Sequence, residues 1–364
     1  MFDRKVGSRV FEGLVLLAAV VSLQIGNGGY TSEFGAHPDE AAHYVTALMV
    51  FDYLREGIPE APMAFATRFY EHYPKVALGN WPPGFYTIQS VWMLMFGVGT
   101  ASVMSLMAAM QWCVAWVVFE TGRRHLGSVY GWAAVAILLL VPLVQKYASM
   151  VMTEIPVALA MLLAALIYSR YMERSEWRFA IGFGLIASFA ILVKGSGLAL
   201  AAIPLLAPLL TRKWNLYKRA SWWAAGVLVF IICFPWSWLT LDLARAGWEG
   251  SSPSWDFTSP ALTYYPAQFF KAMGVIAVIL AAIGALARLT GLFDRLTGTA
   301  STRIEPVWAT LAALAAGVFG LHLVVPVCRG RADVCCSLDG AILADTHNGD
   351  PVDRGGYRAA RLCD

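Results

Sequence analysis

Residues 103–124 read VMSLMAAMQWCVAWVVFETGRR: an uncharged apolar run to Phe119, then one acid and a pair of arginines. A helix needs about 20 apolar residues to cross the hydrocarbon core of a bilayer. Lipid offers no hydrogen-bond partners to the backbone, so such runs are helices rather than strands. Comparable runs recur at 10–26, 84–99, 103–119, 131–146, 152–170, 178–193, 196–211, 221–240, 266–287 and 305–326. The sequence therefore predicts an all-α, polytopic transmembrane helical bundle.

Composition supports a membrane protein. The 364 residues are 58% hydrophobic and 14% charged, with a mean hydropathy of +0.59. Soluble domains are about 45–50% apolar and about 25% charged. The net charge of +3 is too small to indicate nucleic-acid binding, so membrane lipids are the partners that composition indicates.

The basic residues predict the orientation of the bundle. They cluster before the first run and in alternate connections, at Arg4, Lys5 and Arg9; Arg123 and Arg124; Arg170, Arg174 and Arg178; Arg212, Lys213, Lys218 and Arg219; and Arg288, Arg295 and Arg303. The positive-inside rule assigns such connections to the cytoplasm. We therefore expect a cytoplasmic N-terminus, a retained first span, and outward loops at 27–80 and 241–265.

This topology requires an even number of spans between the two outward loops, whereas seven apolar runs lie there. One run is therefore expected to be partial, re-entrant or merged with its neighbour. The shortest are 131–146, 178–193 and 196–211, and the sequence does not choose among them.

The amino-acid composition of the sequence changes after Pro326. Residues 328–364 are rich in Arg, Asp, Gly and Cys and have no helical or strand periodicity. Two interpretations stay open, a disordered polar tail and a truncated or out-of-frame C-terminus. The transmembrane domain is accordingly assigned to 1–326 and a polar tail to 327–364.

The first outward loop carries the most specific pattern, GAHPDEAAHY at 35–44. Pro38 and the following acids suit the first turn of a helix, where carboxylates favour the positive end of the dipole. An apolar stripe follows, so this helix is expected to lie along the membrane surface. Asp39 and Glu40 either cap it and face water, or supply a general base within reach of a hydroxyl.

The segment Asp39–His43 also resembles the HExxH zinc motif with Asp in place of the first His. Because that motif needs both histidines on one helical face, a zinc protease is not expected. No cofactor is therefore predicted. A divalent ion held by His43 and a carboxylate is left open without support, and His43 and Tyr44 are assigned to substrate contacts.

The end of the loop reads YPKVALGNWPPGFY at 73–86. Paired prolines in an aromatic-rich interface suit the rigid start of a membrane helix. Arg68 and Lys75 are the cations in the second half of this loop, and they contact either lipid phosphates or the phosphate of a bound lipid substrate.

Glu154 and Lys194 lie in or beside apolar runs, at 152–170 and between 178–193 and 196–211. Charges at such depth are costly and are functional candidates. Lys194 also has the simpler interpretation of a side chain that extends to the interface.

The order of these features resembles that of the GT-C membrane glycosyltransferases, especially the protein O-mannosyltransferases and the bacterial aminoarabinose transferases. The resemblance covers about 10–326 and rests on the Asp39-Glu40 pair, followed by WPPGFY at 81–86, RRHLG at 123–127, TEIP at 153–156 and GLIASFAILVKG at 184–195.

The resemblance implies an enzyme that moves a sugar from a polyprenyl-phosphate carrier to an acceptor hydroxyl on a lipid, glycan or protein, with inversion. It implies that Asp39, with Glu40 beside it, activates the acceptor, and that Lys75 meets the donor phosphate. Glu154 and Lys194 match recurrent family positions. Six spans between the outward loops are usual in the family, as is a bacterial inner-membrane location for the aminoarabinose transferases.

Two other classes compete with this interpretation. A lipid transporter or flippase would have broken helices and charges near the membrane midplane, whereas the acids here cluster in an outward loop. A non-catalytic truncated homologue is the third alternative.

Overall fold

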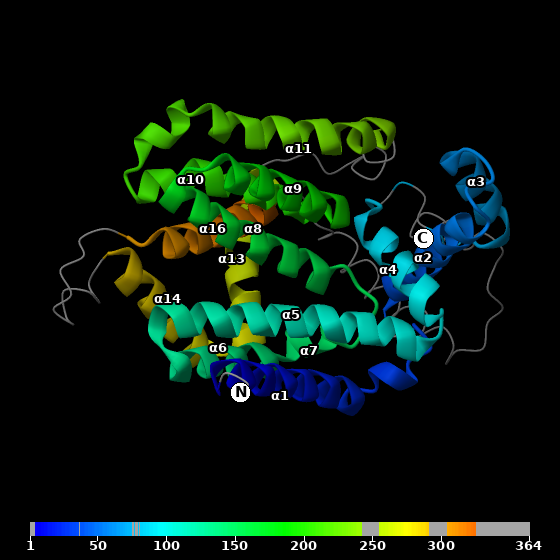
Figure 1. The fold of residues 1–364 in the computed structure, drawn as a ribbon, viewed down its shortest axis with the longest axis horizontal. Coiled ribbons are helices and arrows are strands. Elements are labelled where there is room, and N and C mark those ends of the chain that lie inside the picture. Colours follow the sequence, from blue (N-terminus) through cyan, green and yellow to red (C-terminus); the bar gives the residue numbers. More distant parts are fainter. Residues whose placement is uncertain are drawn as a thin grey trace.

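The computed structural model describes residues 4–35, 37–74, 76, 79, 81–241, 255–290 and 304–324. All regular secondary structure in these residues is helical, which confirms the predicted all-α bundle (Figure 1). Lys75, the predicted tail at 327–364 and most of the predicted outward loop at 241–265 lie outside the described residues.

The elements follow in chain order. The helices are α1 (Arg4–Gly26), α2 (Pro38–Arg55), α3 (Pro62–His72), α4 (Gly84–Phe96), α5 (Thr100–Leu126), α6 (Ser128–Leu140), α7 (Pro142–Ala148), α8 (Glu154–Arg174), α9 (Trp177–Val193), α10 (Ala202–Leu210), α11 (Ala220–Leu239), α13 (Trp255–Met273), α14 (Val275–Leu289) and α16 (Pro306–Val324). Short 3₁₀ helices are η1 (Gly29–Thr31), η2 (Gly195–Ala201) and η3 (Trp214–Lys218).

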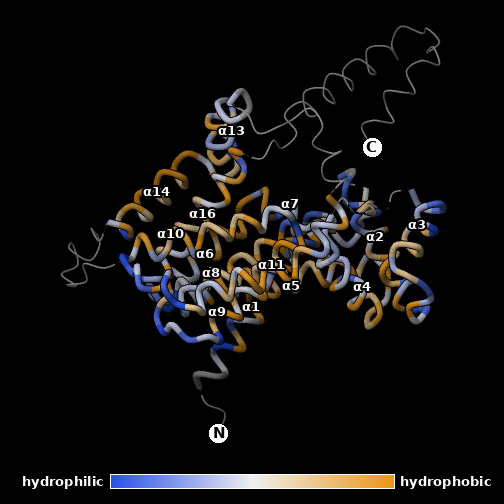
Figure 2. The backbone as a smooth tube through the Cα atoms, turned by 90° about the horizontal axis from the view of Figure 1, so that it is seen from above, coloured by the Kyte–Doolittle hydropathy of each residue, from blue (hydrophilic) through white to orange (hydrophobic). Residues whose placement is uncertain are grey.

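The chain is a multi-pass membrane protein. Five described helices are long and apolar enough to cross a bilayer, namely α1 from Gly7, α5, α8, α11 and α16, and the number rises to seven if each of two bent pairs is one span. Figure 2 shows the apolar middle of these helices between two more hydrophilic ends. One end has the last residues of α5 and α8 and the first of α9, and it is called the basic end below because Arg123, Arg124, Arg170 and Arg178 belong to these helix ends. The other end has α2, α3 and α4 (Figure 1).

The run at 84–99 is not a span, which corrects the prediction. Its helix α4 has 13 residues, about 20 Å, against about 30 Å of hydrocarbon. Both ends of α4 lie at the end away from the basic residues. A Cβ on Gly84 would come within 2.7 Å of Leu192 O at the end of α9, and Val98, after α4, accepts a hydrogen bond from Tyr44 of α2.

Two other runs are broken rather than straight. The run 131–146 forms α6 and α7, bent by 71° where Pro142 begins α7. The run 266–287 divides between α13 and α14, which bend by 109° at Gly274, whose φ of 80° is readily adopted by glycine. Without α4, the described apolar helices between the two loops are α5, α8 and α11, the bent pair of α6 and α7, and two shorter helices, Trp177–Val193 and Gly195–Leu210. The even number of spans between the loops stays a prediction.

Helix α8 lies at the centre and packs against α5, α9 and α16. Its Tyr168 and Tyr171 are among the largest fully buried side chains. Small residues permit close packing nearby: Gly184 of α9 lies against Ala225 of α11. Such contacts between small residues are the usual basis of helix association in lipid. The core thereby fixes the ends of α8 and α9, where Glu154 and Lys194 lie.

Candidate active site

The sequence around Pro38 forms the predicted helix start. His37 is extended and its Nδ1 accepts a hydrogen bond from the Asp39 amide at 3.2 Å, the usual arrangement of a helix N-cap. Pro38 occupies the first turn, where it loses no hydrogen bond, and Asp39 and Glu40 follow it. The helix directs these two carboxylates to different environments.

Asp39 and Glu40 differ in exposure. The Asp39 side chain is 50% exposed, whereas Glu40 is fully buried. Glu40 Oε1 accepts a hydrogen bond from the Val151 amide at 3.1 Å, across 111 residues of sequence. Val151 belongs to the buried non-helical segment between α7 and α8. Glu40 therefore fastens α2 to the bundle, and Asp39 is the carboxylate open to a ligand.

His43 lies one turn further along α2 and is buried. Its ring packs on Trp81 with centroids 4.1 Å apart, and its Nδ1 lies 2.7 Å from the Tyr86 hydroxyl. The pKa of His43 is lowered to about 3, mainly by burial and in addition by the positive charges of Lys194 and His37. His43 is consequently a neutral contact at physiological pH rather than a cation.

Glu154 and Lys194 form an ion pair at the same place. Lys194 Nζ donates to Glu154 Oε1 at 2.6 Å, and the two side chains are 37% and 27% exposed respectively. The second carboxylate oxygen of Glu154 is buried and has no hydrogen-bond partner among the described residues. The Tyr147 hydroxyl lies within electrostatic range of both Glu154 and Asp39.

These contacts bring five predicted residues together from α2, the start of α8 and the end of α9. They are Asp39, Glu40, His43, Glu154 and Lys194, called the α2 cluster below. The cluster combines an open carboxylate, a fastened carboxylate, a neutral imidazole and a cation, at the end of the bundle away from the basic residues. This is a set able to accept a proton and to hold an anion.

Two predicted residues lie elsewhere. Tyr44 stacks on Phe34 with centroids 4.2 Å apart and its hydroxyl donates to Val98 O at 2.7 Å. Arg68 pairs with Glu60 at 2.7 Å and lines a shallow cavity of about 270 Å³ together with Asp52 and others. Asp52 is about 20 Å from Asp39 along α2 at 1.5 Å per residue, so Arg68 is not brought to the cluster.

The residues that hold the cluster were not all singled out from the sequence. Trp81 and Tyr86 stand in the WPPGFY stretch, which was interpreted as the start of a span, and the Val151 amide has no sequence signal. Spacing offers a partial signal, because Trp81 and Tyr86 flank the Pro-Pro-Gly turn that brings α4 against α9. Within the described residues, no group of three or more His, Cys, Asp or Glu side chains is placed to hold a metal ion.

Comparison with protein families matches the central segment of the chain. Residues 80–238 match the family of dolichyl-phosphate-mannose-protein mannosyltransferases. The predicted resemblance is confirmed for this segment. The matched segment contains Tyr86, Val151, Glu154 and Lys194, whereas Asp39 and Glu40 precede it.

Two solved structures are similar to the chain. ArnT from Cupriavidus metallidurans bound to undecaprenyl phosphate has 16% identity and a TM-score of 0.49, over 92% of this chain and 63% of that one. The apo state of the same protein has 18% identity and a TM-score of 0.47, over 93% and 64%. The chain thus spans less than two thirds of these proteins. No curated protein matches it.

Proposed function

We propose that the protein is an inverting glycosyltransferase that moves a sugar from a polyprenyl-phosphate carrier to an acceptor hydroxyl on the outer face of the membrane. The observation that carries this proposal is the half-exposed Asp39, which shares the electrostatic surroundings of Tyr147 with Glu154 of the Glu154–Lys194 pair. It occurs in a chain whose central segment matches a family named for a polyprenyl-phosphate sugar donor. The proposal names no particular sugar, and its acceptor is a hydroxyl on a lipid, a glycan or a protein.

The outward placement rests on charge. The basic end has arginines at the ends or starts of α5, α8 and α9, and such residues are retained in the cytoplasm. The α2 cluster is at the opposite end. A lipid-linked donor lies in the plane of the membrane, so its phosphosugar reaches the interface at the height of a helix such as α2.

The chemistry follows from the groups present. Asp39 accepts the proton of the acceptor hydroxyl as its oxygen attacks the anomeric carbon. The bond from that carbon to the phosphate oxygen breaks, and its electron pair leaves with the lipid phosphate. Attack from the face opposite the leaving group inverts the configuration. Lys194 supplies positive charge for the phosphate, with Lys75 as the predicted second cation, and Glu40 holds the start of α2 in position.

The test is transfer of labelled sugar from a polyprenyl-phosphate donor by the purified protein. Asp39→Asn removes the proton acceptor and is expected to lower the rate about 100- to 10,000-fold. Asp52→Asn, on the same helix but in the separate shallow cavity, is the matched control and is expected to keep activity. Full activity in Asp39→Asn would overturn the mechanism, and movement of labelled lipid without sugar transfer would establish a flippase instead.

Orientation has a test of its own. A cysteine introduced at Arg68 should react with a membrane-impermeant thiol reagent in intact cells, whereas one introduced at Arg178 should react only after the membrane is opened. The Arg68 and Arg178 side chains are 57% and 63% exposed. The reagent can therefore reach a cysteine at either position from the side of the membrane on which that position lies. The reverse pattern would place the α2 cluster in the cytoplasm and end the proposal.

A further inference from the structure

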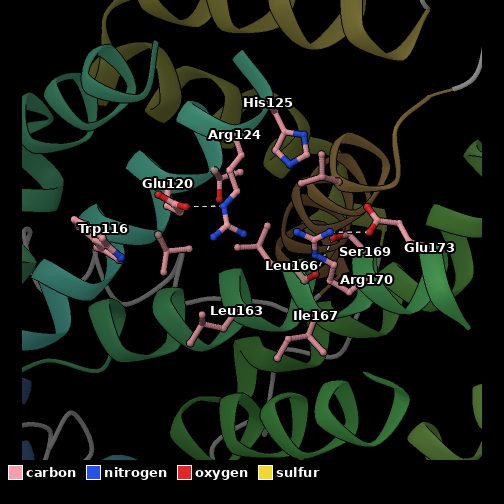
Figure 3. Close-up of a pocket in the computed structure, with 13 residues that line it drawn as sticks. Trp116, Glu120, Arg124, His125, Leu163, Leu166, Ile167, Ser169, Arg170 and Glu173 are labelled. Carbon is pink, nitrogen blue, oxygen red and sulfur yellow. Dashed lines mark hydrogen bonds and ion pairs between the residues drawn. The ribbon is translucent and has the colours of Figure 1, made fainter. Parts of the chain in front are cut away.

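A second cavity lies at the basic end of the bundle, far from the α2 cluster. Its volume is about 290 Å³ and it is bounded by α5, α8 and the start of α16. Figure 3 shows Arg124 of α5 and Arg170 of α8 reaching into the same space from two helices. No part of the proposed transfer chemistry uses this cavity.

The mouth of the cavity is rich in arginine. Glu120 is shared by Arg9, Arg123 and Arg124, at 3.8, 2.7 and 2.6 Å. Arg170 pairs with Glu173 at 2.9 Å, and His125 lies 3.0 Å from Glu305. Arg124, Arg170, His125, Glu120 and Glu173 line the cavity itself, and Arg9, Arg123 and Glu305 pair with them from outside the lining. Four arginines thus accompany three carboxylates in the whole cluster.

The two arginines that enter the cavity have hydrogen-bonding capacity to spare. Arg124 uses its Nε for Glu120, and Arg170 uses Nη1 for Glu173. Each guanidinium has five N–H donors in a planar fork that matches the oxygens of a phosphate. Their side chains are 54% and 44% exposed, so a ligand has access to the remaining donors.

The depth of the cavity is apolar. It is lined there by Trp116 and Val117 of α5, by Leu163, Leu166 and Ile167 of α8, and by Val307 of α16. Trp116 is eight residues before Arg124, about 12 Å along the helix at 1.5 Å per residue. The lining thus changes from cationic to apolar over the distance that separates a lipid phosphate from its first methylene groups.

We propose that this cavity binds an anionic phospholipid of the leaflet at the basic end, with its phosphodiester on Arg124 and Arg170 and its first chain carbons along Trp116 and Leu163. Basic recesses between membrane helices on the cytoplasmic side are suited to such headgroups, and anionic lipids are attracted to that surface. The apolar lining favours a lipid over a free phosphate ion, which would gain nothing from it. The volume suits a headgroup and the start of its chains rather than a whole lipid. The bound lipid joins α5, α8 and α16.

The experiment compares the thermal midpoint of the delipidated protein in detergent with added phosphatidylglycerol, phosphatidylcholine or inorganic phosphate. Phosphatidylglycerol is expected to raise the midpoint by about 3 °C or more above phosphatidylcholine, and inorganic phosphate is expected to leave it unchanged. Native mass spectrometry of the wild type should show retained phosphatidylglycerol. Equal effects of the two lipids, or the same rise with inorganic phosphate, would overturn the proposal.

Variants locate the effect. Arg124→Gln with Arg170→Gln should abolish the difference between the two lipids. Arg178→Gln is the matched control, because it removes an arginine from the same end of the bundle. The Arg178 side chain lies over the Phe179 ring and pairs with Glu176, outside the cavity. It should keep the full difference. Leu163→Trp keeps every charge and fills the apolar depth, so it should also lose the phosphatidylglycerol effect; a retained effect there, or a loss in Arg178→Gln, would contradict the assignment.

Discussion

Helix α9 has an ion pair at each end. The two pairs have the same nitrogen–oxygen distance but differ in how far their side chains are exposed. At its start, Arg178 Nε lies 2.6 Å from Glu176, with side chains 63% and 42% exposed. Beyond its last residue, Lys194 Nζ lies 2.6 Å from Glu154, with side chains 37% and 27% exposed. The first pair meets solvent, whereas the second is less exposed and lies within electrostatic range of the buried His43.

The difference shows that a short distance does not measure what a pair contributes. Solvent and salt screen the pair at the start of α9, and exposed pairs of this kind contribute about 0–1 kcal/mol. The pair at the end lies among groups that have lost water, where charges interact more strongly and unpaired partners cost more. Substitutions in the α2 cluster are therefore expected to cost far more than substitutions at the basic end.

The largest effect on stability is expected at Glu40. Glu40→Ala leaves the Val151 amide without its acceptor at a fully buried position, and such a loss costs about 2–4 kcal/mol. Glu40→Gln keeps an acceptor oxygen and should cost about half as much. The free energy of unfolding in detergent measures both. A Glu40→Ala protein as stable as the wild type would mean that α2 is held by other contacts.

The next effect concerns the contact that brings α4 to the end of α9. A Cβ at Gly84 would lie 2.7 Å from Leu192 O, closer than atoms approach, so Gly84→Ala should cost about 1–3 kcal/mol. Gly226→Ala is the control, because nothing lies within 4 Å of that Cβ on α11, and it should be neutral or stabilising by about 0.4–1 kcal/mol. Equal effects of the two substitutions would show that α4 adjusts freely.

Part of this site could be predicted from the sequence. Asp39 follows a helix-starting proline in a loop that contrasts in charge with its neighbours, and Glu154 and Lys194 are conspicuous because charges beside apolar runs are costly. Glu154 and Lys194 do form an ion pair, and the Tyr147 hydroxyl lies within electrostatic range of both Glu154 and Asp39. Arg68 is predicted to meet a phosphate because it is a cation in the second half of the loop, but it stands on α3, beyond the far end of α2, where Glu60 pairs with it.

The rest depended on packing that hydropathy does not encode. An apolar run of 13 residues in α4 has the composition of a short span, and only its contacts with Leu192 and Tyr44 show that it stays at one end. Glu40 and Asp39 are adjacent and chemically alike, so their separation into a buried and an exposed carboxylate follows from the angle of α2 on the bundle. The bend at Gly274 likewise has no apolar signature.

The pH dependence of stability should identify the buried histidine. The pKa of His43 is about 3 in the folded protein and about 6.5 unfolded. Between these values the unfolded state binds the proton and the folded state does not, so stability falls as pH decreases from about 6.5 toward 3. The slope is about 1.4 kcal/mol per pH unit. His43→Gln should remove this part of the slope, and His72→Gln, on the exposed α3, should leave it. The same slope in both variants would contradict the burial of His43.

The smallest effects test the two ends of α9 against each other. Double-mutant cycles with Lys194→Met and Glu154→Gln should give a coupling energy of about 1 kcal/mol or more, since the pair is partly desolvated and belongs to a network. The same cycle with Arg178→Met and Glu176→Gln should give about 0.3 kcal/mol. Added salt should weaken the Arg178 coupling and change the Lys194 coupling much less, because screening acts on exposed charges. Equal couplings with equal salt dependence would mean that solvent reaches both ends of α9 alike, and the α2 cluster would then lack the desolvation on which its distinct energetics depend.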